Sequence, residues 1–172
     1  NMTRFVAFLR GVSPMNANMP ALKASFEAAG FTNVKTILSS GNVVFDCDLI
    51  DESEIEKIAE ETMMKNLGRS FFTIVRTAQS LANLLSSDPY ALHGIPSNAK
   101  RVITFMRETR RPQVELPLTQ DNASVFLLSE RVAFTAYVPT DKGAIFMRLI
   151  ERAFGKNVTT RTVETVAKCA VA

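Results

Sequence analysis

Residues suited to holding an anion occur at several predicted turns. Those that we select as candidate ligand-binding residues are Arg10, Gly41, Asn42 and Arg161. Arg10 ends an apolar run, and Gly41 and Asn42 form a tight turn, where backbone N–H groups can point at an anion. Thr160 and Arg161 are predicted to open a helix, whose free N–H groups favour phosphate or carboxylate. The sequence therefore predicts an anion-binding site.

Each of these positions also has a purely structural explanation, which stays open. Asn42 is an ordinary turn residue, Thr160 is a helix N-cap and Arg10 pairs with a carboxylate in that explanation. Lys142-Gly143, at another predicted helix start, is equally ambiguous.

Catalytic chemistry has little support in this chain. The single histidine is His93, and neither Cys47 nor Cys169 is placed by sequence to meet it. The number of Cys and His residues excludes the usual zinc sites, and no P-loop, dinucleotide fingerprint or nucleophile elbow is present. We therefore predict no catalytic residue, no metal and no cofactor. The sequence favours a non-enzymatic protein over an enzyme.

The first half of the chain must position Arg10 and the Asn42 turn. Hydrophobic patterns predict four strands and two helices, in the order βαββαβ of a ferredoxin-like unit. The strands are Thr3–Leu9, Val34–Leu38, Val43–Phe45 and Ser70–Arg76, and the helices run from Pro20 to Gly30 and over 52–67. Ser53 and Glu56 are spaced as a capping box for the second helix.

The second half is predicted to hold an antiparallel sheet and C-terminal helices. Its strands are Lys100–Arg107, Ser124–Leu128 and Val132–Val138, and its helices cover 142–154 and a segment from Thr160. The predicted fold is therefore α+β, with a ferredoxin-like subdomain over 2–86 and a second α+β subdomain over 87–172 packed on it.

Composition bears on the partners of the protein and on its cellular location. Residues 1–61 hold 5 Lys/Arg and 9 Asp/Glu, whereas residues 62–172 hold 15 and 8, which weakly favours an anionic partner for the second half. Two widely spaced cysteines are typical of free thiols in a reducing compartment. No apolar run has the length of a membrane span. We expect a cytoplasmic location.

Several motifs resemble those of the bacterial DUF1697 family of uncharacterised proteins. They are Phe8-Leu9-Arg10-Gly11, Gly30-Phe31, Ser40-Gly41-Asn42-Val43-Val44-Phe45 and Thr159-Thr160-Arg161-Thr162-Val163. The resemblance implies a cytosolic α+β protein with a ferredoxin-like N-terminal part and implies no established activity. This chain departs from the family pattern at Val12–Asn18, at Ile37 and at Thr162–Val163, so a family site built from those loops is altered here.

Three functions remain open. The first is a non-enzymatic binding protein for an anionic small molecule or nucleotide, using Arg10, Asn42 and Arg161. The second is an interaction or self-assembly module that pairs through a sheet face or edge. The third is an enzyme of unrecognised type, centred on His93. Nucleic-acid binding is weakly supported, because Phe residues in a predicted sheet are usually core residues.

Overall fold

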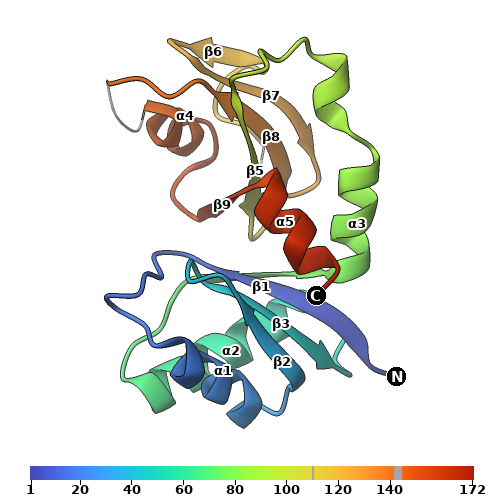
Figure 1. The fold of residues 1–172 in the computed structure, drawn as a ribbon, viewed down its shortest axis with the longest axis vertical. Helices are drawn as coiled ribbons and strands as arrows, with labels where there is room; N and C mark the ends of the chain where they lie inside the picture. The colour runs from blue at the N-terminus through green and yellow to red at the C-terminus, as the bar shows by residue number, and fades with distance from the viewer. Residues whose placement is uncertain (110, 142–144) are drawn as a thin grey trace. The chain divides into compact units, whose positions relative to one another are not determined.

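Two antiparallel β-sheets with associated helices make up the computed structural model, which describes residues 1–109, 111–141 and 145–172 (Figure 1). The predicted α+β class is confirmed. Lys142-Gly143 lies outside the described residues. The chain divides into a first unit, Asn1–Leu84 with Val166–Ala172, and a second unit, Leu85–Thr165. The boundaries predicted from the sequence instead place the C-terminal residues in the second part, 87–172.

The first unit holds a four-stranded sheet in the order β2-β3-β1-β4. Its elements are β1 (Thr3–Leu9), α1 (Met19–Ala28), β2 (Thr32–Ile37), β3 (Asn42–Cys47), α2 (Glu52–Leu67), β4 (Thr73–Thr77) and α3 (Ala78–Ser86), which ends beyond the unit. Helices α1 and α2 cover one face of this sheet (Figure 1). Every strand pair is antiparallel, with Phe5 opposite Phe45 and Ala7 opposite Val75.

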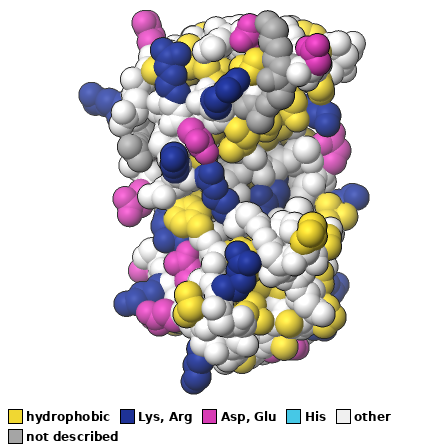
Figure 2. Space-filling view, turned by 90° about the vertical axis from the view of Figure 1, so that its left-hand side faces the viewer, with side chains coloured by type: hydrophobic (Ala, Val, Ile, Leu, Met, Phe, Trp, Pro, Cys, Tyr) yellow, Lys and Arg dark blue, Asp and Glu magenta, His cyan; other side chains and the backbone are white. Residues whose placement is uncertain are grey.

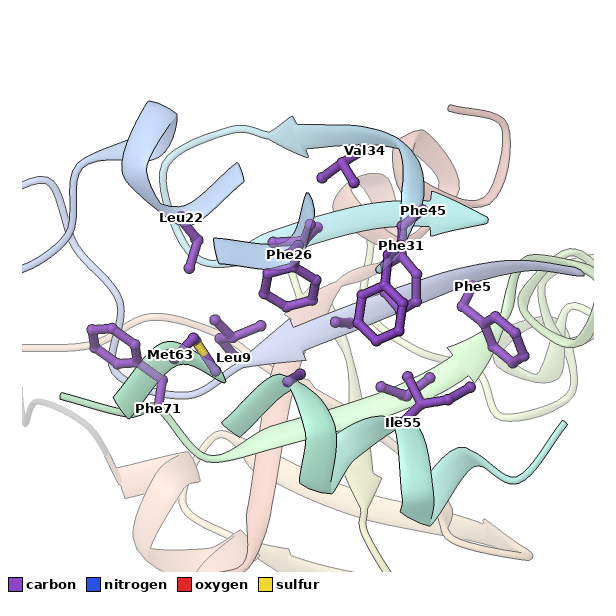
Figure 3. Close-up of a cluster of buried hydrophobic side chains, with 14 of the residues drawn as sticks. Phe5, Leu9, Leu22, Phe26, Phe31, Val34, Phe45, Ile55, Met63 and Phe71 are labelled. Atoms are coloured by element: carbon purple, nitrogen blue, oxygen red, sulfur yellow. The ribbon is translucent and has the colours of Figure 1, made fainter. Parts of the chain in front are cut away.

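The core of the first unit lies between that sheet face and the two helices (Figure 3). Aromatic rings dominate it: Phe31 stacks on Phe45 with ring centroids 4.4 Å apart, and Phe26 packs against the same ring at 5.5 Å. Phe5 and Phe8 are 1% and 0% exposed, so neither ring of β1 is presented to solvent for stacking on a base.

The N-cap of helix α2 differs from the predicted one. Asp51, rather than Ser53, is the N-cap, because its carboxylate accepts the Ser53 N–H at 3.0 Å. The predicted capping box is therefore wrong. Glu56 points instead to the sheet, where its Oε2 accepts the Val75 N–H at 2.8 Å. Gly68 ends the helix in the left-handed conformation, as its position after the apolar pattern predicts.

Charged side chains occupy the outer edge of β4, which is an edge strand of the sheet. Besides Glu56, Glu60 accepts the Thr73 N–H through Oε2 at 2.8 Å. Arg76 donates from Nη1 to the Val75 carbonyl at 2.9 Å. Because an unpaired edge is a template for another strand, these contacts remove part of that template.

The second unit holds a five-stranded sheet in the order β6-β7-β8-β5-β9. Its elements are the 3₁₀ turn Pro89–Leu92, β5 (Lys100–Met106), β6 (Leu118–Gln120), β7 (Ala123–Ser129), β8 (Val132–Tyr137), α4 (Ile145–Phe154) and β9 (Val158–Thr162), followed by the start of α5 (Val163–Ala170). Helix α4 buries its apolar side, including Leu149, Ile150 and Phe154, in a cluster with Met106 and Val158.

The C-terminal region corrects one prediction that bears on the site. Thr160 and Arg161 do not open a helix, because they lie on β9, which pairs antiparallel with β5. The helix begins afterwards at Val163, and the Thr162 hydroxyl accepts the Thr165 N–H at 3.3 Å as its cap. Among the described residues, no helix is both long and apolar enough to cross a membrane.

Candidate anion-binding site

Three of the predicted ligand-binding residues lie together in the first unit. The end of β1 meets the turn between β2 and β3, where Leu9 N–H donates to the Gly41 carbonyl at 2.8 Å and Phe8 stands opposite Asn42. Arg10 continues from β1 and donates its backbone N–H to the Phe72 carbonyl at 2.8 Å. Arg10, Gly41 and Asn42 are therefore neighbours at one end of this sheet.

The side chain of Asn42 stabilises the turn to which it belongs. Its side chain is buried, and Nδ2 donates to the Ile37 carbonyl at 2.9 Å and to the Ser40 hydroxyl at 3.1 Å. These two bonds close the turn from inside. Gly41 has φ of +89°, a left-handed conformation that favours glycine.

The loop that departs from the family pattern is also closed by an asparagine. Asn16 Nδ2 donates to the Gly11 carbonyl at 2.8 Å, and its Oδ1 accepts the Ser13 N–H at 2.9 Å. Asn18 then caps α1 by accepting the Ala21 N–H at 3.1 Å. The loop thus has a defined turn structure.

Arg161 lies in the second unit, whereas the other three candidates lie in the first. Its Nη1 donates to the Thr159 hydroxyl and to the Thr160 carbonyl, both at 2.8 Å. Arg161 faces the same side of the sheet as Ile103, its partner in β5, because opposed residues of an antiparallel pair share a face.

The residues considered for catalysis lie in separate settings. His93 is exposed, and its ring lies 4.5 Å from that of Phe126. Cys47 and Cys169 are buried and are not joined in a disulfide, and burial raises the pKa of the Cys47 thiol. Over the residues that the structure describes, no group of three or more His, Cys, Asp or Glu side chains is arranged to hold a metal ion.

A pocket that the sequence analysis missed brings cations together at one end of the second sheet. We call it the basic pocket; its volume is about 450 Å³, and it is lined by Ser97, Ala99, Lys100, Arg101, Thr162 and Glu164. Lys100 and Arg101 begin β5, and Thr162 ends the neighbouring strand β9 opposite Val102. Both cationic side chains are exposed, so they are available to a ligand from solvent.

A buried tyrosine lies beside Arg101, one of the lining residues of this pocket. Tyr90 is 4% exposed. Its hydroxyl can donate to either of two strand carbonyls, that of Val102 at 2.8 Å or that of Thr135 at 3.1 Å. The Arg101 guanidinium carbon lies 5.4 Å from the centre of the Tyr90 ring. This cation–π contact favours a defined position for the Arg101 head group.

The charges of the basic pocket act on Tyr90 as well. Burial raises the pKa of Tyr90, the positive charge of Arg101 lowers it, and the negative charge of Glu164 raises it. The hydroxyl therefore stays neutral and keeps its proton for the strand carbonyls. Glu164 also places one carboxylate beside the two cations, so the pocket combines both signs of charge.

The comparisons with known proteins fit this description of the fold. The family model described as protein of unknown function DUF1697 matches residues 2–134. The chain belongs to this family. Among solved structures, it is similar to the conserved bacterial protein SP0830 from Streptococcus pneumoniae, with 14% sequence identity, a TM-score of 0.71, and coverage of 99% of this chain and 98% of that one. At this identity the likeness shows the fold alone. No curated protein matches the chain.

Proposed function

We propose that this DUF1697 protein binds an anionic small molecule without transforming it, and that the basic pocket of the second unit is the binding site. The observation that carries the proposal is that two successive basic residues at the start of β5, Lys100 and Arg101, both line a pocket of about 450 Å³. Two adjacent cations, one with a planar guanidinium, suit phosphate or carboxylate oxygens.

Further features support this proposal. The pocket also offers the hydroxyl group of Ser97, which can donate to an anion oxygen. Arg161, a predicted ligand-binding residue, directly precedes Thr162 in β9. The second half of the chain carries the excess of basic residues. Each feature increases the attraction of this unit for an anion.

The cellular location that we propose is the bacterial cytoplasm, supported by the two buried cysteines, which are thiols rather than a disulfide. For the first unit we propose a ferredoxin-like arrangement, supported by its element order and by its strand order β2-β3-β1-β4. Arg10, Gly41 and Asn42 remain predicted ligand-binding residues of that unit, and the turn contacts described above supply a structural role for Gly41 and Asn42.

Isothermal titration of the full chain with inorganic pyrophosphate tests the proposed function. We expect saturable binding, with Lys100→Ala and Arg101→Ala each weakening it about tenfold, because a charge-assisted hydrogen bond contributes about 1.5–3 kcal/mol. Glu164→Gln should tighten binding, since it removes the carboxylate from the pocket. Arg148→Ala, which removes an exposed cation of α4, is the matched control and should leave the affinity unchanged.

The opposite pattern would reject the proposal. Absence of pyrophosphate binding by the wild-type chain contradicts it. Equal losses in Lys100→Ala, Arg101→Ala and Arg148→Ala also contradict it, because they would indicate general attraction to a basic surface.

A further inference from the structure

Two more pockets lie at the same end of the second sheet, and one of them adjoins the basic pocket. The one farther away, which we call the aromatic pocket, has a volume of about 270 Å³ and includes Asp121, Asn122, Tyr137, Thr140 and Phe146 in its lining. Between them lies a connecting pocket of about 200 Å³. Asp121, Asn122, Tyr137 and Val138 line both the aromatic and the connecting pocket, and Ala99 lines both the connecting and the basic pocket.

The aromatic pocket has a flat apolar wall. The rings of Tyr137 and Phe146 are stacked, with centroids 4.1 Å apart and planes within 5° of each other. Both side chains are half-buried, and Val138 and Ile145 add aliphatic surface beside them. Figure 2 shows hydrophobic side chains gathered in the upper part of the face in view, where Figure 1 draws α4. A further planar ring can pack against this pair in an offset or edge-on arrangement.

Polar groups at the rim give this pocket hydrogen-bonding capacity. Asp121 and Asn122 form the turn between β6 and β7, and the Asn122 carbonyl accepts the Val138 N–H at 2.8 Å. Asp121 has φ of +52°, which holds the turn in a left-handed conformation. Carboxylate and amide oxygens at this position can accept from an amino group on a ring.

The strand order fixes the separation between the aromatic and the basic pocket. Tyr137 on β8 stands opposite Lys100 on β5, and β5 in turn pairs with β9, which ends at Thr162. Adjacent strands lie about 4.8 Å apart, so Tyr137 lies one strand spacing from Lys100 and two, roughly 10 Å, from the β9 side of the basic pocket. An extended nucleoside di- or triphosphate covers such a span between its base and its terminal phosphate.

We infer that the ligand is a nucleoside di- or triphosphate, whose base packs against the Tyr137–Phe146 wall and whose terminal phosphates lie in the basic pocket, between β5 and the end of β9. This inference rests on the proposed anion-binding function and extends it to the chemical class of the ligand. The ribose occupies the connecting pocket, beside the polar groups of Asn122 and Ser124. Pockets with a mostly apolar lining and a few placed polar groups are typical of small-molecule sites.

Titration of the full chain with ADP, pyrophosphate and adenosine tests the inference. We expect ADP to bind at least about tenfold more tightly than pyrophosphate, because base–aromatic stacking contributes about 1–3 kcal/mol. Phe146→Leu, which keeps an apolar side chain in the fold, should weaken ADP binding about tenfold and leave pyrophosphate binding unchanged. Asp121→Asn, which tolerates the left-handed turn, should weaken ADP binding only.

The outcomes separate the two proposals. Equal affinities for ADP and pyrophosphate, or a Phe146→Leu variant that binds ADP as well as the wild type, overturn the nucleotide inference while the anion site stands. Loss of both ligands in Lys100→Ala together with loss of ADP alone in Phe146→Leu supports both. Failure of the wild-type chain to bind either ligand overturns both.

Discussion

Gly41 lies directly against Val12. A Cβ atom at Gly41 would come within 2.9 Å of Val12 Cβ and 3.0 Å of the Leu9 carbonyl oxygen. The turn between β2 and β3 and the loop after β1 therefore fit together only because position 41 has no side chain.

Gly41→Ala should destabilise the protein more than another glycine substitution at positive φ. Gly30 has φ of +96°, but a Cβ added there would meet no atom within 4 Å, so Gly30→Ala measures backbone strain alone, about 1–2 kcal/mol. Gly41→Ala adds overpacking of about 1–3 kcal/mol. Urea denaturation gives both free energies of unfolding, and equal losses would show that the contact with Val12 relaxes without cost.

Glu56→Ala should weaken the docking of α2 on β4. The substitution leaves the buried Val75 N–H without its carboxylate acceptor, which costs about 1–3 kcal/mol. Glu56→Gln keeps a carbonyl oxygen and should lose less. The matched control is Glu61→Ala on the same helix, whose exposed pair with Lys57 at 4.0 Å contributes at most about 1 kcal/mol. Hydrogen exchange at the Val75 amide should speed up in Glu56→Ala, and an unchanged rate would contradict this account.

Tyr90→Phe should lower stability while keeping the aromatic contacts. It removes the hydroxyl that reaches the Val102 and Thr135 carbonyls, at a cost of about 1–2 kcal/mol. The ring would still pack edge-on against Phe126 and Phe134. Thermal unfolding should show a lower Tm, and Tyr137→Phe, which retains its stacking on Phe146, should show little change. A Tm equal to the wild type would mean that the hydroxyl bonds add no net stability.

Asp46 should make stability depend on pH in the acid range. A hydrogen bond from Asn33 and the charge and hydrogen bond of Arg4 hold the pKa of Asp46 below its ordinary value. A lowered pKa stabilises the fold above the unfolded-state value, about 4, and this contribution is lost as pH falls through the folded-state pKa. The stability difference between wild type and Asp46→Asn should therefore shrink between pH 6 and pH 2. Arg4→Gln should lose part of the same pH dependence, and a difference that is constant over this range would refute it.

Local patterns in the sequence were sufficient for the class of the fold and for most of its elements. Apolar runs and glycine caps, such as Gly68 after α2, predict where the elements lie because those signals are contained within a few residues. The Ser53 cap was wrong because Asp51, two residues earlier, is an equally good N-cap. The helix from Thr160 was wrong because the strand at Val158–Thr162 forms by pairing with β5, far away in sequence.

The basic pocket could not be predicted from the sequence for the same reason. Lys100-Arg101 is a pair of basic residues at the start of a predicted strand. The pocket that this pair lines, however, also requires the end of β9. Thr162 comes beside Lys100 and Arg101 only through the pairing of β5 with β9. For Asn42, the position in a turn follows from the local sequence. Its burial depends on the completed sheet and could not be predicted in the same way.

The carboxylates on the outer edge of β4 have a consequence for the order of folding. Glu56 and Glu60 reach residues only 19 and 13 positions away, whereas β4 finds its strand partner β1 across more than sixty residues. Closing a short loop costs less entropy than closing a long one, and local contacts form faster. We therefore expect α2 and β4 to form an early kinetic nucleus, to which β1 is added later.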